Sequence, residues 1–496
     1  MEAALQRFEY KYMAYEQELM RMEIRALLPH SVLVEDGRQM RLYGLRPEDT
    51  AALDRLTYIA SYSIEDVRRY TKQSQLEQDK EKNPRRQNTR YASHGLHEYK
   101  GKFNPQIVHS LLNILGVERG GAVLDPFCGS GTTLAESAIW GVSSYGVDLN
   151  PLAAQLSNLK VQALRLDCAQ AERALEGAVE CLSGGSGGLP LKGTPREEYL
   201  LNWLPKDTFF LLERLWRYTE AMDGTTALLF RMSASNLIRE YSLQEPQDLR
   251  IRRRSSPLPE TPFVEAWAEM VARQLARVAH AQPYLDAAVD GYAEQGDIRT
   301  QMPFRRRFDA AITSPPYATA LPYIDTQRIS LVWLGLCPPD RIMELESALI
   351  GSREFYHAQR EALYGRMAGN EDALPEGVMS LILQLQNDLT GEDGFRRKAV
   401  PLLLYRYFSD MKKMFRNVSL MMKPGARYAL VVGNNKTTIG GKLNIIDTPV
   451  LLAQVAEDAG WRVERLFPLQ TYQRYGLHAK NAITRETLIV LKQGGE

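Results

Sequence analysis

The chain has 496 residues, of which 44% are hydrophobic and 24% are charged, and its formal net charge is +1. This length allows two or three domains, or one domain with large insertions, and the composition is ordinary for a soluble globular protein. No window is apolar for long enough to cross a membrane, and the amphipathic start of the chain shows no signal peptide. The four cysteines form no Cys-x-x-Cys pair. A zinc site or disulfide framework is therefore disfavoured, and a cytoplasmic protein without a membrane partner is predicted.

The beginning of the chain predicts a small N-terminal helical and hairpin module, residues 1–90. Apolar residues at helical spacing over 5–28 predict a long amphipathic helix. Short apolar segments on both sides of Asp36-Gly37 predict a hairpin. A second helix is predicted to open at Pro47 and to run to about Tyr70. The simplest role of this module is to pack against the rest of the protein.

A basic run follows the N-terminal module. Between residues 80 and 102 there are seven Lys or Arg residues and only two acids. Such a run is either a solvated loop or a flexible arm that contacts a nucleic-acid backbone in a salt-sensitive way. A helix is predicted from Ile107 to Leu115, and His97 in the segment before it is expected to be structural.

A glycine-rich turn is the centre of the next segment. The apolar strand 122–125 ends in Asp125, and Gly129 and Gly131 precede a predicted helix over 134–140. The glycines allow the backbone to approach a ligand closely, and the start of the helix offers N–H groups. There is no lysine for a phosphate-binding P-loop and no third glycine for a nicotinamide fold. A second strand ends in Asp148, which either accepts hydrogen bonds from a ribose diol or caps the next helix.

Residues 161–290 predict a mainly helical insertion. It contains a glycine- and serine-rich linker over 183–188 and predicted helices over 199–218, 227–241 and 261–280. The densest basic cluster of the chain, Arg250 to Ser256, lies between the last two helices. This cluster predicts either a nucleic-acid contact or a disordered polar loop, and we favour the contact.

A buried strand over 308–313 ends in the tetrapeptide Ser314-Pro315-Pro316-Tyr317. The two prolines stiffen the turn and remove its N–H donors. A rigid row of acceptors beside an aromatic ring remains, which suits a planar base that carries an amino group. Asp297 precedes this strand and is the best candidate for an acid at the end of a third strand, whereas Arg305 to Arg307 read as a solvated strand entrance.

The remainder of the chain predicts the completion of an α/β sheet. Residues 338–400 are helical and loop-rich without recognisable chemistry, and they suggest a lid or part of a recognition surface. A helix over 402–420 is followed by a turn at 423–425 and a buried strand over 428–433. The last segment, 448–491, predicts one helix and two closing strands.

Together, the turn at 125–133, the acids at 148 and 297 and the tetrapeptide resemble the amino-methyltransferases of DNA. These enzymes use S-adenosylmethionine to methylate N4 of cytosine or N6 of adenine. The resemblance implies an α/β fold with a doubly wound Rossmann-like methyltransferase sheet, a largely helical insertion and a small N-terminal module. The domains that it implies are the cofactor half 91–160, the candidate DNA-contact and target-recognition insertion 161–290, the catalytic strand 291–337, a helical insertion or lid 338–400 and the C-terminal half 401–496.

The resemblance also implies roles for individual residues. Ser314 and the Pro315 carbonyl would accept hydrogen bonds from the target amine, next to Pro316, and Tyr317 would stack on a base flipped out of duplex DNA. The residues expected to bind S-adenosylmethionine are Lys102, Phe103, Asp125, Pro126, Phe127, Gly129, Ser130, Gly131, Thr132, Asp148, Leu149 and Asp297. No metal is expected.

The target and the partners remain partly open at this point. Within the family, serine at the first tetrapeptide position leans toward N4 of cytosine, although N6 of adenine stays possible. Methylation at carbon 5 of cytosine is excluded, because no Pro-Cys dipeptide is present. The expected partners are double-stranded DNA and a restriction or defence-system protein. The rivals are an RNA base methyltransferase, which usually carries Asp-Pro-Pro-Tyr, and a catalytically idle DNA-binding subunit.

Overall fold

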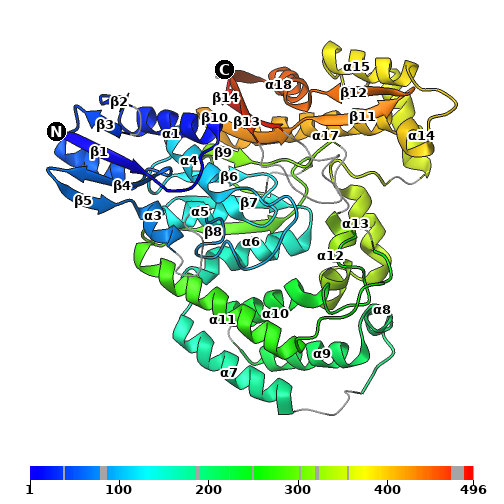
Figure 1. Cartoon of the computed structure of the whole chain (residues 1–496). Coiled ribbons are helices and arrows are strands. Elements are labelled where there is room, and N and C mark those ends of the chain that lie inside the picture. The colour runs from blue at the N-terminus through cyan, green and yellow to red at the C-terminus, as the bar shows by residue number, and fades with distance from the viewer. Residues whose placement is uncertain are drawn as a thin grey trace.

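The structure is a computed structural model. It describes residues 1–36, 39–78, 87–184, 190–222, 224–248, 251–300, 303–318, 323–354, 357–470 and 485–494. A central sheet lies between an N-terminal module and a C-terminal group of helices, and a lobe of helices lies beneath the sheet in the view of Figure 1. No helix in these described ranges is long and apolar enough to span a membrane.

The central sheet has seven strands in the order β13-β14-β10-β9-β6-β7-β8. Their bounds are β6 (Ala122–Asp125), β7 (Ser143–Asp148), β8 (Gly291–Gln295), β9 (Phe308–Thr313), β10 (Met422–Gly433), β13 (Trp461–Gln470) and β14 (Arg485–Gln493). The strands from β10 to β8 are all parallel, and β14 runs antiparallel to both of its neighbours. The predicted doubly wound α/β methyltransferase sheet is confirmed.

The strand order fixes where a ligand can bind. From β6 the chain moves outward through β7 and β8, and it then returns to the middle of the sheet for β9 and moves the other way to β10. The order therefore reverses between β6 and β9. In open α/β sheets, a crevice at the carboxyl ends of the strands forms at such a reversal. The glycine-rich turn follows β6 and the tetrapeptide follows β9, so both lie at this crevice.

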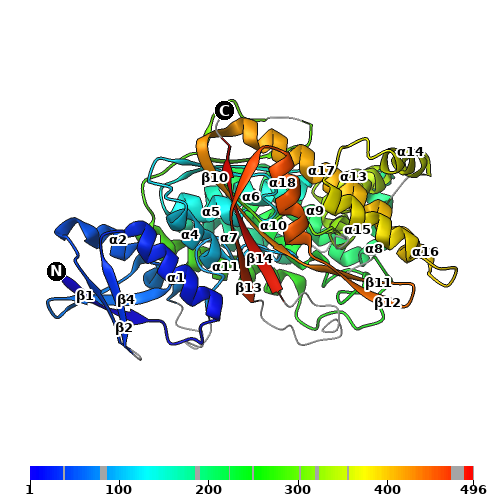
Figure 2. The same ribbon diagram turned by 90° about the horizontal axis from the view of Figure 1, so that it is seen from above.

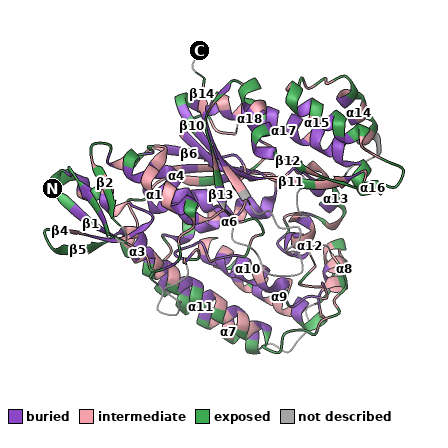
Figure 3. Ribbon diagram, turned by 45° about the horizontal axis from the view of Figure 1, so that its top comes forward, coloured by how far each residue is buried: buried purple, intermediate pink, exposed green. Residues whose placement is uncertain are grey.

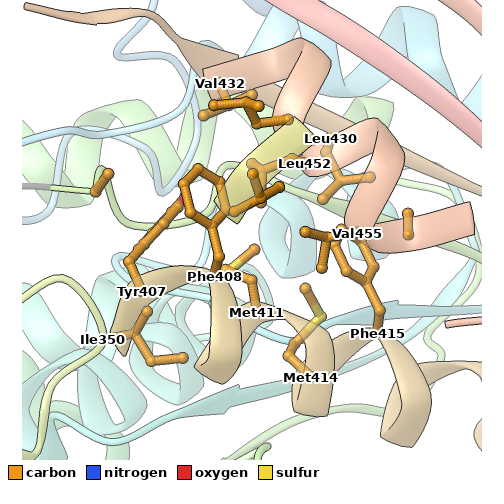
Figure 4. Close-up of a cluster of buried hydrophobic side chains, with 14 of the residues drawn as sticks. Ile350, Tyr407, Phe408, Met411, Met414, Phe415, Leu430, Val432, Leu452 and Val455 are labelled. Atoms are coloured by element: carbon orange, nitrogen blue, oxygen red, sulfur yellow. The ribbon is translucent and has the colours of Figure 1, made fainter. Parts of the chain in front are cut away.

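Helices cover both faces of the sheet because successive strand residues point to opposite sides. Along β10, Leu430 and Val432 belong to one buried cluster, and Ala429 and Val431 belong to the other. Figure 4 shows the first cluster, where Leu430 and Val432 lie among side chains of two helices. The main helices of the core are α4 (Pro105–Ile114), α5 (Thr132–Ile139), α6 (Pro151–Ala163), α17 (Val400–Met421) and α18 (Thr448–Asp458).

The N-terminal module is built around a five-stranded antiparallel sheet in the order β2-β3-β1-β4-β5. Its edge strands β2 and β5 are largely exposed (Figure 3). Its elements are β1 (Glu2–Arg7), α1 (Ala14–Leu27), β2 (Val32–Asp36), β3 (Gln39–Tyr43), α2 (Thr50–Asp54), β4 (Ile59–Ile64), β5 (Val67–Tyr70) and α3 (Lys72–Glu77).

Two helix predictions in this module are wrong. The start of the predicted helix 5–28 is strand β1, in which burial alternates with a period of two residues. The predicted helix 47–70 ends at Asp54, and strands β4 and β5 occupy its second half. In both segments, pairing with neighbouring strands overrides a spacing that also fits a helix. The predicted hairpin is confirmed in its strands β2 and β3, and its Gly37 lies outside the described residues.

The helical lobe consists of α7 (Cys168–Gly184), α8 (Pro195–Trp203), α9 (Lys206–Glu220), α10 (Gly224–Ile238) and α11 (Phe263–Ala281). The predicted helix 199–218 is in fact α8 and α9, because Pro205 forces Leu204 into an extended conformation. Most of the predicted linker, residues 185–188, lies outside the described ranges. The buried core of the lobe extends to α12 (Tyr323–Trp333), which directly follows the tetrapeptide segment.

The C-terminal part contains a bulged strand and a projecting ribbon. The predicted turn at 423–425 is a bulge within β10, where the register shifts and Gly425 adopts a φ of +72°. After β10, the chain forms a separate two-stranded ribbon, which extends away from the sheet in Figure 2. The remaining elements are α13 (Ile342–Ala348), α14 (His357–Ala368), α15 (Glu376–Asn387), α16 (Phe395–Lys398), β11 (Asn435–Ile439) and β12 (Lys442–Ile446).

Candidate functional site

A single pocket lies at the carboxyl ends of β6, β7 and β9. It brings together the glycine-rich turn, the acid after β7, the segment before α4 and the tetrapeptide, although these are up to about 200 residues apart in the sequence. Every residue predicted to bind the cofactor or the base lines this pocket, with the exception of Gly131. The predicted residues that line it are Lys102, Phe103, Asp125, Pro126, Phe127, Gly129, Ser130, Thr132, Asp148, Leu149, Asp297, Ser314, Pro315, Pro316 and Tyr317.

The turn after β6 is held by short-range contacts and by one contact to β9. The carboxylate of Asp125 accepts a hydrogen bond from the backbone N–H of Phe127 at 3.1 Å. It also accepts one from the Thr313 hydroxyl at 2.6 Å, which ties the turn to the residue before the tetrapeptide. Gly131 is the N-cap of α5 with a φ of +74°, and a Cβ there would lie 2.6 Å from the Cα of Ser157. Gly131 therefore shapes the turn from behind, without contributing to the pocket wall.

Asp148 connects the turn to the second strand. Its carboxylate accepts hydrogen bonds from the backbone N–H groups of Gly129 and Asn150, both at 2.9 Å. The helix that follows is capped by Asn150, whose side chain accepts a hydrogen bond from Leu152. The alternative that Asp148 itself is the cap is therefore incorrect, and its carboxylate faces the pocket at the strand end.

Burial sets the electrostatics of these two acids. Removal from water raises the pKa of Asp125 to about 6, and burial does the same for Asp148. A ligand that brings positive charge or hydroxyl donors would stabilise their ionised forms. The aromatic rings of Tyr99 and Tyr323 stack with centroids 6.5 Å apart and line the same pocket. Two buried carboxylates beside aromatic rings fit a ligand with an ammonium group, a ribose and a planar base, as S-adenosylmethionine has.

Asp297 is placed differently from the other two acids. The Arg299 guanidinium donates three hydrogen bonds to the carboxylate of Asp297, at distances between 2.7 and 3.1 Å. Arg299 also donates to Asp410 and to the carbonyl of Ala348. Burial opposes ionisation of Asp297, but the hydrogen bonds and charge of Arg299 hold its pKa below the usual range. Asp297 thus lines the pocket as part of an ion-pair network that joins β8 to α13 and α17.

The segment before α4 closes another side of the pocket. The Lys102 ammonium donates to the carbonyls of Thr89 and His94, so it fastens this segment internally even though Lys102 also lines the pocket. His97 is buried, and its ring contacts the carbonyl of Glu98 at 2.7 Å. Burial lowers the pKa of His97 to about 4, which agrees with the structural role expected for it.

The tetrapeptide is fixed by a contact from the far end of the chain. The Tyr317 hydroxyl donates to the Glu486 carboxylate at 2.7 Å. Because β14 is antiparallel, Glu486 near its N-terminal end pairs with Gly433, the last residue of β10, at the carboxyl edge of the sheet. The Tyr317 ring is half-buried against the main core cluster. Its orientation therefore depends on β14, which sequence patterns did not associate with the site.

The structure adds pocket residues that the sequence analysis missed. Tyr99 belongs to the segment already expected to cover the cofactor, and Tyr323 follows the tetrapeptide closely, so proximity in sequence was an available signal. Arg299 carried the same signal, because it lies two residues after the predicted Asp297, whereas the stretch 348–350 carried none. The stretch 348–350 comes from the region 338–400, in which no chemistry was recognised, and yet it forms part of the pocket wall.

Two arginines of the predicted basic cluster have partners within the protein. Arg253 donates to Asn202 and lies over the ring of Trp203, with its guanidinium carbon 4.6 Å from the ring centroid. Arg254 donates to the carbonyl of Ser242 at 2.9 Å. These arginines fasten the loop between α10 and α11, which contradicts a disordered loop and weakens the case for DNA contact. Arg250 and most of the basic run, residues 80–86, lie outside the described residues.

Comparisons with known proteins find similarity to DNA methyltransferases. A family model described as DNA methylase, of the N6/N4 methyltransferase type, matches residues 34–158. The Type II methyltransferase M.BsoBI of Geobacillus stearothermophilus is 23% identical over 462 residues, which cover 81% of this chain and 86% of that protein. The Type II methyltransferase M.MvaI of Kocuria varians is 20% identical over 402 residues, which cover 74% of this chain and 82% of that protein.

A shorter match has a different description. A tRNA (guanine(10)-N2)-dimethyltransferase of Methanothermobacter thermautotrophicus is 38% identical over 52 residues, which cover 10% of this chain and 16% of that protein. The similarity to the Type II methyltransferases therefore extends over most of the chain, whereas the similarity to the tRNA enzyme is confined to a short segment.

Proposed function

We propose that this chain is an S-adenosylmethionine-dependent amino-methyltransferase of the DNA methylase family and that it methylates the exocyclic amine of a base flipped out of duplex DNA. The proposed target is N4 of cytosine in preference to N6 of adenine, in a modification or defence system. The observation that carries this proposal is the shared pocket, in which the glycine-rich turn and the tetrapeptide face one another.

The tetrapeptide is suited to activate a poor nucleophile. The lone pair of an exocyclic amine is delocalised into the base, so the nitrogen attacks only when hydrogen-bond acceptors help it to become pyramidal. Ser314 would accept one hydrogen bond from the amine, and the Pro315 carbonyl would accept another. Since Pro315 and Pro316 have no N–H groups, neither proline donates a hydrogen bond that would compete for those acceptors.

The opposite wall would hold the methyl donor. S-adenosylmethionine supplies a methyl group on a positively charged sulfur that leaves as a neutral thioether. Asp148 would accept hydrogen bonds from the ribose hydroxyls, and Asp125 would lie near the amino group of the methionine end. Phe103 would cover that end of the pocket. Holding donor and acceptor in one orientation contributes a large part of the rate enhancement of such transfers.

Tyr317 would hold the extruded base by stacking. Flipping a base out of a duplex costs a few kcal/mol, so the pocket must compensate with aromatic and hydrogen-bonding contacts. The hydrogen bond from Tyr317 to Glu486 fixes the ring before the base arrives. A fixed ring stacks on the base without a further loss of side-chain entropy.

Labelled methyl transfer tests the proposal. The protein is incubated with unmethylated duplex DNA and S-adenosylmethionine labelled on its methyl group, and the DNA is digested to nucleosides and analysed by mass spectrometry. The expected product is labelled N4-methylcytosine. Labelled N6-methyladenine would correct the choice of base, and the absence of label in DNA would contradict the proposal.

A second candidate is an RNA base methyltransferase, which the short match to a tRNA enzyme favours. A parallel reaction with tRNA in place of DNA separates the two, because label should enter only the true substrate. A catalytically idle DNA-binding subunit is the third possibility. It predicts no label in either nucleic acid, even though the protein binds DNA.

A further inference from the structure

The two-stranded ribbon β11–β12 and helix α16 form one projecting unit, which we call the ribbon unit (residues 388–398 and 435–446). The segment before α16 packs on the tip of the ribbon, where the N–H of Gly440 donates to the Asp393 carboxylate at 2.9 Å. A Cβ at Gly440 would lie 2.4 Å from the carbonyl oxygen of Asp388, so the two parts are in close contact. Figure 2 shows the ribbon and α16 extending together away from the sheet.

Each face of the ribbon carries two large apolar side chains, but only one of these pairs is covered. Ile439 and Ile446 point inward, are at most 1% exposed and join the main core cluster. On the outer face, Leu443 is 66% exposed and Ile445 is 69% exposed. A ribbon with one face against water normally carries polar residues on that face. A bare apolar outer face therefore indicates a surface that binds a partner.

Helix α16 adds a third exposed apolar side chain to this unit. Phe395 is 73% exposed. Among the large hydrophobic side chains that the structure describes, Phe395, Ile445 and Leu443 are the three most exposed. Their occurrence in one unit argues against a chance distribution over the surface, where single exposed apolar residues need no explanation.

The ribbon unit is also rich in positive charge. Its cationic side chains, all on exposed residues, are Arg396, Arg397, Lys398, Lys436 and Lys442. Its acids are Asp388, Glu392 and Asp393, and the Asp393 carboxylate is turned inward, where it accepts hydrogen bonds from the backbone of Thr390 and Gly440. A cationic rim around apolar side chains complements a nucleic-acid groove, whose edges are phosphates and whose floor presents base edges and thymine methyl groups.

The position of the ribbon links it to the pocket. Leu430 of β10 pairs with Thr313 of β9, the residue directly before the tetrapeptide. Strand β10 ends three residues later at Gly433, and the chain continues through Asn434 into β11. The ribbon therefore leaves the sheet at the same edge, and at about the same level, as the residues that face the target base.

We propose that the outer face of the ribbon unit docks into a groove of the duplex DNA that flanks the target base. This inference rests on the proposed function, because it assumes that duplex DNA is the substrate. The major groove of B-DNA admits a two-stranded ribbon. Leu443 and Ile445 would contact the floor of the groove. Arg396 and Lys436, which lies opposite Ile445 on the same face of the ribbon, would contact the phosphates on its edges.

Two double variants test this surface. L443S/I445S removes the two outer apolar side chains, and R396A/K436A removes two cations. The control V32S/V34S alters two exposed valines on β2 of the N-terminal sheet, which are 61% and 45% exposed. Binding to a pool of short, unmethylated duplexes of randomised sequence is measured by fluorescence anisotropy at several salt concentrations. Total methyl incorporation into the pool, cofactor affinity, oligomeric state and the melting temperature are measured alongside.

The two variants should differ in their salt dependence. R396A/K436A should weaken DNA binding and lower the slope of log affinity against log salt by about two, one for each phosphate contact that is lost. L443S/I445S should weaken binding about tenfold with an unchanged salt slope, because apolar contacts release no counterions. Methyl incorporation at limiting DNA should fall in proportion. The control should match the wild type, and all variants should keep the cofactor affinity and melting temperature.

Three results would overturn the inference. Unchanged DNA affinity in both double variants would show that the ribbon unit does not touch DNA. A shift of L443S/I445S from dimer to monomer, with DNA affinity retained, would assign the face to a second copy of this chain. If the wild type transfers methyl groups to RNA and fails to bind the duplex pool, the proposed function itself fails, and the inference fails with it.

Discussion

The two walls of the pocket are held in place by different kinds of contact. The glycine-rich turn is fixed from nearby in the sequence: Asp125 accepts from Phe127, Asp148 accepts from Gly129, and Ser157 donates to the carbonyl of Gly129 at 3.0 Å. The tetrapeptide corner is fixed from a distance. Thr313 donates to Asp125, 188 residues away, and Tyr317 donates to Glu486, 169 residues away.

This difference means that one wall can form from a single β-α-β unit, whereas the other requires the whole sheet. The turn, β7 and the start of α6 contain nearly all the contacts that shape the cofactor wall. The corner needs β6 on one side of β9 and, through β14, the last strand of the chain. We therefore expect changes in the two walls to separate cofactor binding from methyl transfer.

The largest expected effect is that changes in the tetrapeptide corner reduce methyl transfer alone, whereas a change at Asp148 reduces cofactor affinity. S314A or Y317A should reduce methyl transfer by roughly 100-fold or more, because the amine loses an acceptor or the base loses its stacking partner, and both should keep the wild-type affinity for S-adenosylmethionine. D148A should lose most of the cofactor affinity. Single-turnover transfer and equilibrium binding of the labelled cofactor measure the two quantities separately. Unchanged transfer in S314A and Y317A would mean that the base-binding wall lies elsewhere.

A second prediction concerns the shape of the turn. G131A places a Cβ 2.6 Å from the Ser157 backbone at a φ of +74°, so the turn must shift and cofactor affinity should fall by about tenfold or more, with roughly 1–3 kcal/mol of destabilisation. Gly120 is a matched control, since its φ is +77° and no atom lies within 4 Å of its Cβ position. G120A should cost about 1 kcal/mol of stability and leave cofactor affinity unchanged. Equal cofactor affinities in the two variants would contradict this account.

A third prediction concerns the pH dependence of cofactor affinity. Because burial raises the pKa of Asp125 and Asp148 to about 6, both are largely protonated at pH 5 and ionised at pH 7. If the ionised forms hold the cofactor, its affinity should drop by about tenfold for each group between pH 7 and pH 5. Equilibrium dialysis at both pH values measures this, and D125N should show a weaker pH dependence than the wild type. A constant wild-type affinity would remove these carboxylates from the binding scheme.

The same raised pKa values predict that the free energy of unfolding of the unliganded protein changes with pH in the opposite direction to cofactor affinity. Between the unfolded pKa near 4 and the folded pKa of about 6, the folded state binds more protons than the unfolded state. The contribution of these two groups to the free energy of unfolding therefore falls as pH rises through this window and is constant above it. Denaturant unfolding at pH 5 and pH 7, compared between the wild type and D125N, isolates this contribution.

The smallest expected effect concerns the support of the tetrapeptide corner. E486A should lower the rate of methyl transfer by about tenfold, because Tyr317 loses the partner that orients its ring, and E486Q should recover most of the loss by accepting the same hydrogen bond. Cofactor affinity and the melting temperature should stay near the wild type in E486Q. If E486A and E486Q are equally impaired, the carboxylate acts through its charge and not through the position of Tyr317.

Local sequence patterns predicted the elements whose structure depends on residues that are adjacent in the chain. The apolar strands before Asp125, Asp148 and Ser314 have the right length and end in residues with clear chemistry, so both walls were identified before their relation was known. Patterns failed where strand pairing decided the outcome. Strand β1 shares a spacing of apolar residues with a helix, and only its pairing with β3 and β4 makes it a strand.

Charge in the sequence was a weaker guide than apolar spacing. The arginines at 253 and 254 looked like a nucleic-acid surface, yet the fold uses them to fasten a loop. The less dense charges at 396 and 436 lie on the ribbon unit, for which we propose a DNA contact because of its exposed apolar side chains. Whether a cation is available depends on which carbonyls and carboxylates the fold brings to it, and those partners are distant in sequence.

By itself, the sequence determined the kind of fold and identified the glycine-rich turn and the tetrapeptide, because each of these two motifs consists of residues that are adjacent in the chain. Only the tertiary structure decided that these motifs line one pocket, that Arg299 joins Asp297 to Asp410 and to the carbonyl of Ala348, that Glu486 supports Tyr317 and that the ribbon leaves two apolar side chains uncovered. These are contacts between segments more than a few residues apart or between different strands, and they follow from the order of strands in the sheet, which no local pattern encodes.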